Sequence, residues 1–190
     1  MRQGFVKVAA VTPKIVVADT RENTKLICEE IRKAEESGAK IIVLPELAIT
    51  GYTCSDLFLQ EKMLREAKQS LLEIAAFTFA LDCIVFVGLP LEYNGKLYNV
   101  AAALNNGKVL GFVPKTYLPN YNEFYEARHF TRGMDEVVTV RLDKDLTAPM
   151  GKKLLFVCDT MPELKIGVEL CEDLWTPEPP AIRHALNGAN

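Results

Sequence analysis

The sequence predicts an α/β protein in which helices cover the faces of β-sheets. Two observations support this fold class. The first part of the chain alternates apolar, strand-like runs with amphipathic helical segments, as layered α/β folds do. The middle part holds short strand-like runs separated by Asn94-Gly95 and Asn105-Asn106-Gly107, which favour tight β-hairpin turns.

The first predicted helix runs from about residue 19 to 37 and follows a strand expected at 5–12. Asp19 can cap this helix, with Glu22 three residues later as in a capping box. Gly38 stands just past the last turn, where a left-handed residue commonly ends a helix. The buried stripe is expected to consist of three residues at helical spacing, Ile27, Ile31 and Ala34.

Two further runs predict the second strand and the second helix. KIIVLP at 40–45 is almost continuously apolar and stops at Pro45, which is typical of a strand buried on both faces. A long helix is expected over roughly 56–80, with Leu72, Ala76 and Phe79 facing inward.

From residue 83 onward, the chain is expected to be rich in short strands. The runs CIVFVGLP, LEY, LYNVAAAL and KVLGFV precede a loop at 114–133 that is rich in aromatic residues and proline. Three more strands are predicted at about 136–141, 153–158 and 164–170, before a helix that begins near Pro180.

The last residues, RHALNGAN, have the pattern of a helix end followed by a glycine cap. Earlier in the chain the similar phrase EESGAK leads directly into the strand IIVLP. We therefore expect the chain to be part of a longer protein whose next element is a core strand.

Composition favours a globular protein and argues against two classes of partner. With 190 residues and 49% hydrophobic content, the chain can bury one substantial core. Its net charge is −3 and its basic residues are scattered, so it lacks the electrostatic footprint of a nucleic-acid-binding protein. No apolar run approaches the roughly 18 residues of a membrane helix. We expect neither nucleic acid nor a membrane as a partner.

Five cysteines occur at wide spacings, and the chain has only two histidines. There is no CxxC motif and no Cys/His cluster, so neither a metal site nor a disulfide framework is predicted. Unpaired cysteines are normal in a reducing compartment, and the cytoplasm is therefore the expected location.

Three chemically different side chains follow predicted strands: Glu46 after IIVLP, Lys115 after VLGFVP and Cys171 after KIGVEL. Each alone has an ordinary structural explanation, as a turn residue, a solvated lysine or an inert buried thiol. Together they form a complete set, because a carboxylate can act as general base for a thiol while an ammonium stabilises an oxyanion. Cys171 would then not need to be a thiolate at rest, which its acidic neighbours disfavour.

The motifs around these residues resemble the nitrilase (carbon–nitrogen hydrolase) superfamily and its Glu–Lys–Cys triad. Glu46 lies in LPELAITGY, Lys115 in PKTYLPNYNEFYE and Cys171 in ELCEDLW. Within the superfamily, TGYTCSDLF, KTYLPNYNEFYEARHF and CEDLWTPEPP are similar to the glutamine-amidase domains of glutamine-dependent NAD synthetases. The resemblance covers essentially the whole chain.

This resemblance implies a nitrilase-like αββα sandwich, truncated at its C-terminal side. Residues 1–190 would form the N-terminal part of the amidase domain, without its remainder and without the synthetase domain. It also implies that the 190-residue chain alone is weak or inactive as a glutaminase, because some substrate contacts would lie beyond Asn190.

The resemblance further implies the chemistry. Cys171 would attack the side-chain amide of glutamine, and Glu46 would take the thiol proton and deliver it to the departing ammonia. Lys115 and the backbone N–H of Glu172 would bind the oxyanion.

Three substrate-side residues are implied in the same way. Tyr121 and Glu172 match positions that contact glutamine, and Glu123 matches a second glutamate near the lysine and the cysteine. The amidase step would need no cofactor, while the full-length enzyme would use ATP and Mg²⁺ in a C-terminal synthetase domain. Family members of this kind assemble into homo-oligomers.

Two other functions remain open at this point. One is a stand-alone amidase or nitrilase that acts on another small amide or nitrile, and CEDLWTPEPP argues against it. The other is a non-catalytic, nitrilase-like binding domain, and the intact Glu–Lys–Cys set argues against that.

Overall fold

The computed structural model describes residues 4–190, and the chain divides into two compact units. Unit 1 comprises Met1–Leu91 and Ala102–Leu110, and unit 2 comprises Glu92–Ala101 and Gly111–Asn190.

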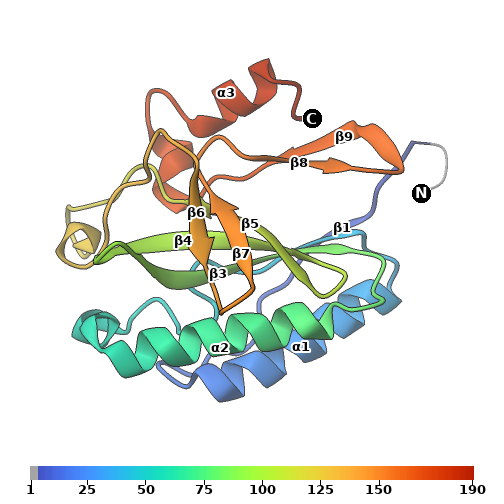
Figure 1. Cartoon of the computed structure of the whole chain (residues 1–190). Helices are drawn as coiled ribbons and strands as arrows, with labels where there is room; N and C mark the ends of the chain where they lie inside the picture. The colour runs from blue at the N-terminus through green and yellow to red at the C-terminus, as the bar shows by residue number, and fades with distance from the viewer. Residues whose placement is uncertain (1–3) are drawn as a thin grey trace. The chain divides into compact units, whose positions relative to one another are not determined.

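Unit 1 is built on three parallel strands, β1 (Val8–Ala10), β2 (Ile41–Val43) and β3 (Ile84–Tyr93). Parallel neighbours need long crossover connections. Helix α1 (Thr20–Glu36) connects β1 to β2, and α2 (Glu61–Phe77) lies between β2 and β3. The two helices pack side by side along the strands of this unit (Figure 1).

Helix α1 confirms the Asp19 cap, the Gly38 end and the buried stripe, but the Asp19 N–H donates to the Val16 carbonyl, so Glu22 does not complete a capping box. The Asp19 carboxylate accepts a hydrogen bond from the Glu22 N–H at 3.0 Å, and Gly38 follows the helix with φ of +89°. The three predicted stripe residues, Ile27, Ile31 and Ala34, are all buried.

The second predicted helix is wrong in its start and in its inward face. A 3-10 helix, η1 (Ser55–Leu59), precedes α2, which begins only at Glu61. Phe79 is 72% exposed and Ala76 is also exposed, while Leu72 is half-buried. The stretch LLEIAAF has apolar residues at adjacent positions, so the pattern alone does not fix which face is buried. The buried face lies one position away, at Met63, Ala67, Leu71, Ile74 and Ala75.

The first two strands are shorter than predicted. The run at 5–12 yields only the three residues of β1, and the run at 40–45 yields only β2. Val43 is 44% exposed, so β2 is not buried on both faces as expected.

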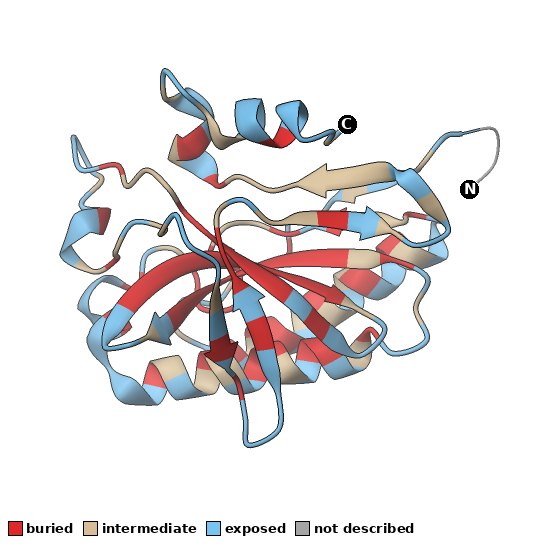
Figure 2. Ribbon diagram, turned by 45° about the horizontal axis from the view of Figure 1, so that its top comes forward, coloured by how far each residue is buried: buried red, intermediate tan, exposed pale blue. Residues whose placement is uncertain are grey.

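The two hairpins confirm the predicted turns. Strand β3 continues through LEY to Tyr93, β4 spans Lys96–Asn105 and β5 spans Lys108–Pro114. The turn residues Asn94 and Gly95 both have positive φ, as do Asn106 and Gly107, and this is the requirement of a type I′ turn. The strand order of the seven-stranded sheet is β1-β2-β3-β4-β5-β7-β6. Figure 2 shows that β3 and β4 are buried over most of their length.

Unit 2 contains two antiparallel strand pairs and one short α-helix among its described residues. Strand β6 (Val138–Arg141) pairs with β7 (Thr147–Met150), and β8 (Leu155–Cys158) pairs with β9 (Met161–Gly167). Strand β7, which the sequence did not predict, also pairs in parallel with β5 through Phe112 and Met150. Its sequence, TAPM, is too short and too poor in β-branched residues to indicate a strand without its partners.

Helix α3 (Pro180–Leu186) begins at the predicted residue and packs against β9. A Cβ atom placed on Gly167 would lie 2.7 Å from the Cβ of His184, so this close approach requires glycine.

Two further findings concern the described part of the chain. None of its helices is long and apolar enough to cross a membrane. All five cysteines, at 28, 54, 83, 158 and 171, carry free thiols.

Candidate active site

Lys115 follows directly after strand β5, as the sequence predicted. Its N–H donates to the carbonyl of Asn99 at 2.9 Å, which extends the strand pairing by one residue. Its side chain is fully buried. A buried ammonium is costly unless an opposite charge accompanies it.

The counter-charge of Lys115 comes from Glu126, at 2.7 Å between Nζ and Oε1. Glu126 is 5% exposed and begins the short 3-10 helix η2 (Glu126–Arg128). The loop from Lys115 to Gly133 closes on itself, because the N–H of Gly133 donates to the Lys115 carbonyl at 2.8 Å.

Sequence reasoning missed Glu126 and proposed Glu123 as the glutamate near the lysine. Glu123 is exposed, and no ion pair joins its carboxylate to Lys115 within residues 4–190. The sequence did not indicate that Lys115 would be buried and would therefore need a buried carboxylate beside it. It could not choose between two glutamates three residues apart, because the choice depends on how the loop folds back.

Cys171 does not end a strand, contrary to the sequence prediction. Strand β9 ends at Gly167, and Cys171 is the first residue of the 3-10 helix η3 (Cys171–Trp175). Its φ is +47°, in the left-handed region that non-glycine residues rarely adopt. The residue is exposed, so a sharp turn presents the thiol to solvent.

Asp173 ties this turn to the segment after Lys115. Its Oδ1 accepts the N–H of Tyr117 at 2.7 Å and that of Thr116 at 3.0 Å. Its Oδ2 accepts the N–H of Leu170 at 3.2 Å. Asp173 is 1% exposed, and burial raises the pKa of its carboxyl group while these backbone hydrogen bonds partly counteract the rise.

Tyr121 and Glu172, the predicted substrate contacts, lie together. The Tyr121 hydroxyl donates to Glu172 Oε2 at 2.9 Å. This hydrogen bond is the largest cause of a raised pKa of the Tyr121 hydroxyl, and the charges of Glu172, Cys171 and Glu123 add to it. Unit 2 therefore brings Tyr121 and Glu172 into one region with the Cys171 turn.

Glu46, the predicted general base, belongs to unit 1. Strand β2 ends at Val43, and Glu46 lies in the turn that follows, half-buried. The turn packs tightly on Gly88 of β3, where an added Cβ would lie 2.3 Å from the N of Leu47. The Ile49 N–H also donates to the Gly88 carbonyl at 3.2 Å. These contacts fix the backbone that follows Glu46.

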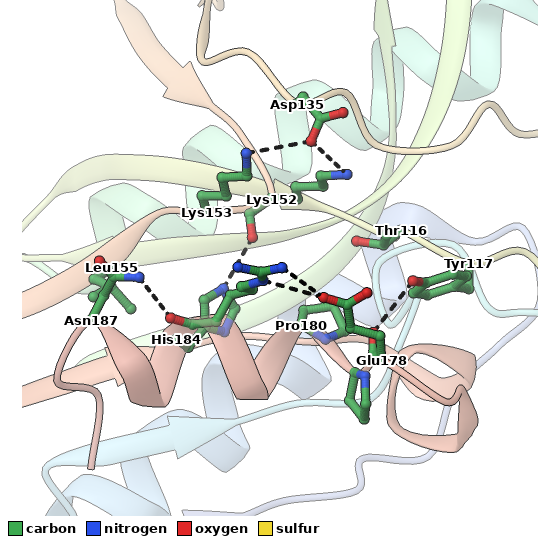
Figure 3. A pocket seen from close by; sticks show the side chains of 12 residues that line it. Thr116, Tyr117, Asp135, Lys152, Lys153, Leu155, Glu178, Pro180, His184 and Asn187 are labelled. Atoms are coloured by element: carbon green, nitrogen blue, oxygen red, sulfur yellow. Dashed lines mark hydrogen bonds and ion pairs between the residues drawn. The ribbon is translucent and has the colours of Figure 1, made fainter.

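Unit 2 also has a cavity of about 770 Å³, which is lined in part by Thr116 and Tyr117 (Figure 3). Its charged lining is largely self-neutralised, with Lys152 and Lys153 paired to Asp135 and Arg183 paired to Glu178. None of Lys115, Tyr121, Cys171 and Glu172 lines it. We therefore place the candidate active site at the Cys171 turn rather than in this cavity.

The comparisons with known proteins identify the family of this chain. The carbon–nitrogen hydrolase family model matches residues 7–190. The glutamine-dependent NAD(+) synthetase of Mycobacterium leprae (strain TN) is 38% identical over 187 residues, which are 98% of this chain and 27% of the relative. The human enzyme of the same name is 34% identical over 179 residues, which are 90% of this chain and 25% of the relative. The chain thus spans about a quarter of the length of these curated relatives.

Two solved structures support the fold. The glutamine-dependent NAD(+) synthetase from Cytophaga hutchinsonii has a TM-score of 0.80 at 33% identity, over 88% of this chain and 28% of that one. An amidase from Nesterenkonia sp. has a TM-score of 0.73 at 20% identity, over 100% of this chain and 64% of that one, and shows likeness of fold alone. The predicted α/β fold of nitrilase type is confirmed. The chain belongs to the carbon–nitrogen hydrolase family.

Proposed function

We propose that this chain is the glutamine-amidase part of a glutamine-dependent NAD synthetase, with Cys171 as the nucleophile. The observation that carries the proposal is the conformation of Cys171, an exposed thiol held at positive φ on a turn that Asp173 links to the lysine segment. Strained backbone of this kind gathers at catalytic sites. The names of the relatives that are 34–38% identical supply the substrate.

In the proposed reaction, Sγ of Cys171 attacks the side-chain amide carbon of glutamine while Glu46 accepts the thiol proton. The Lys115 ammonium and the Glu172 N–H stabilise the oxyanion of the tetrahedral intermediate. The C–N bond then breaks, and Glu46 returns the proton to the leaving nitrogen, which departs as ammonia. A γ-glutamyl thioester remains on Cys171.

The second half of the reaction uses the same residues. Glu46 takes a proton from water, whose oxygen attacks the thioester carbon. The C–S bond then breaks, Glu46 returns the proton to Sγ of Cys171, and glutamate leaves. Acid and base are thus one carboxylate acting in turn. Lys115 supports both halves as a fixed positive charge, because Glu126 provides the counter-charge that keeps a buried ammonium tolerable.

Substrate recognition is assigned to the Tyr121 region. Glu172 would bind the α-ammonium of glutamine, and Tyr121, which already donates to Glu172, would orient that carboxylate. Glu123 is proposed as a further carboxylate on the substrate side, because its negative charge contributes to the raised pKa of the Tyr121 hydroxyl. The role of the glutamate beside the lysine goes to Glu126 instead.

The remaining parts of the proposal concern the longer protein. The amidase step needs no cofactor. Its ammonia would serve a C-terminal synthetase domain that uses ATP and Mg²⁺ to amidate nicotinic acid adenine dinucleotide to NAD. The lengths and names of the relatives support such a domain. A homo-oligomer and a cytoplasmic location complete the proposal, the latter because the thiols are unpaired.

A glutamine-analogue electrophile such as 6-diazo-5-oxo-norleucine tests the nucleophile in the whole protein. Peptide mass spectrometry should find the label on Cys171, and the Cys171→Ala variant should take up none. Cys158→Ala, which removes another accessible thiol in unit 2, should label normally. A label that persists in Cys171→Ala would exclude Cys171 as the nucleophile, and a wild-type protein that takes no label would exclude a glutamine site.

A further inference from the structure

Asp173 is a buried carboxylate that the proposed chemistry does not use. It stands two residues after the nucleophile and is 1% exposed, yet it has no cationic hydrogen-bond partner among those described for it. Burying an ionised carboxylate without a salt bridge is expensive, and only strong hydrogen bonds make it tolerable. These hydrogen bonds therefore determine which backbone segments the buried carboxylate holds in place.

The hydrogen bonds of Asp173 reach two segments that are far apart in sequence. One side of the carboxylate accepts the Leu170 N–H, and the Asp173 N–H donates back to the Leu170 carbonyl at 2.9 Å. This reciprocal pair closes the turn around Cys171. The other side accepts the N–H groups of Thr116 and Tyr117, the two residues that follow Lys115.

A simple capping role does not explain this pattern. A cap would need only the bonds within Leu170–Asp173. The shortest bonds instead go to the distant segment, at 2.7 and 3.0 Å against 3.2 Å for Leu170. Hydrogen bonds to a charged acceptor are about twice as strong as neutral ones. The carboxylate therefore fixes the lysine segment at least as firmly as it fixes its own turn.

We propose that Asp173 is a positioning residue that sets the Lys115 backbone against the Cys171 turn, so that the oxyanion donors are in register with the nucleophile. This inference rests on the proposed function. The Thr116 and Tyr117 N–H groups anchor the lysine side of the site, and the Leu170 N–H anchors the thiol side. A displacement of about 1 Å between such groups can cost on the order of 100-fold in rate.

The test compares Asp173→Asn and Asp173→Ala with Asp159→Asn, an exposed aspartate of the same unit, in the whole protein. The maximal velocity of the glutaminase reaction is divided by the concentration of Cys171 that the electrophile can titrate, which gives a kcat per site in which unfolded molecules do not count. We expect kcat per site to fall roughly 10- to 100-fold in Asp173→Asn and further in Asp173→Ala, with KM changed by less than about threefold. Asp159→Asn should match the wild type.

A wild-type kcat per titrated site in both Asp173 variants would overturn the proposal, whatever their melting temperatures. If neither variant folds, the peptide bond between Thr116 and Tyr117 can be replaced by an ester. This change removes the Tyr117 N–H that donates to Asp173 Oδ1 at 2.7 Å. A lowered kcat per site in that ester supports the proposal, and an unchanged kcat overturns it.

Failure of the proposed function would look different. If the wild-type protein has no glutaminase activity, the proposed function is wrong. The rate of Cys171 alkylation by iodoacetamide then still tests whether Asp173 positions the Cys171 turn. That rate should change in Asp173→Asn and not in Asp159→Asn, and equal rates in all three proteins would overturn the role of Asp173.

Discussion

Cys171 lies among carboxylates, and its backbone conformation offers a better clue to its role than its charge environment. The left-handed φ of +47° costs energy for a side chain with a Cβ, and the turn closed by Leu170 and Asp173 holds it there. In the proposed reaction the thiol gives up its proton only as Glu46 accepts it, and such a thiol can tolerate acidic neighbours such as Glu172.

The ion pair of Lys115 and Glu126 gives a direct prediction at the residue scale. Glu126→Ala leaves a fully buried ammonium without this partner, and removing one member of a buried pair typically costs about 3–5 kcal/mol. We expect the free energy of unfolding in urea to fall by that order. Glu123→Gln, on the exposed part of the same loop, should change it by less than about 0.5 kcal/mol. Equal losses in the two variants would show that Glu126 has no special role.

The Tyr121–Glu172 hydrogen bond predicts a measurable titration shift. The carboxylate raises the pKa of the Tyr121 hydroxyl, because it stabilises the protonated phenol and opposes a second negative charge. Subtracting the ultraviolet titration of Tyr121→Phe from that of the wild type isolates this one tyrosine. In Glu172→Gln, the isolated pKa should move down toward 10.0, the ordinary value. A pKa that stays in place would mean that the hydrogen bond is not formed in solution.

At the scale of elements, the turn that carries Glu46 depends on its contact with β3. Gly88→Ala would place a Cβ 2.3 Å from the Leu47 backbone nitrogen. A backbone atom cannot move out of the way by a change of rotamer, as a side-chain atom can. We expect a loss of about 1–3 kcal/mol in unfolding free energy. In the whole protein, kcat per titrated Cys171 should also fall, because the proposed base is displaced.

Gly151→Ala is the matched control for this prediction. Its new Cβ would lie 3.0 Å from the Val137 Cγ2, which belongs to a side chain that can move. A smaller stability loss and an unchanged kcat per site are expected. If Gly88→Ala were as mild as Gly151→Ala, the contact between β3 and the Glu46 turn would not constrain the site.

At the scale of the whole molecule, Asp173 should contribute to the pH dependence of the free energy of unfolding. Its folded pKa is raised above 3.8, so over the window from about 3.8 up through the raised value the native state binds more protons than the unfolded state. Unfolding free energy contributed by this group therefore falls as pH rises through that window. The difference in unfolding free energy between wild type and Asp173→Asn should decrease with rising pH there. Urea unfolding at a series of pH values would contradict this if the difference stayed constant or grew.

How far the sequence predicts each element follows from whether its signal is local. The caps of α1 and the two Asn-Gly turns were predicted correctly, because a capping side chain and a positive φ are set by neighbouring residues. The inward face of α2 was predicted wrongly and β7 was missed, because adjacent apolar residues leave the face ambiguous and TAPM becomes a strand only through its partners. Contacts with other parts of the fold, rather than the local segment, determine both the buried face of α2 and the formation of β7.

The sequence by itself determined the fold class, the family and the identity of the candidate nucleophile, since these rest on residue types and local motifs. Only the tertiary structure decided that Glu126 rather than Glu123 pairs with Lys115, and that Asp173 binds the Thr116 and Tyr117 N–H groups. The physical reason is the same for both. A buried charge pairs with whichever polar or charged group the folded chain places beside it. That placement depends on contacts between residues far apart in the sequence.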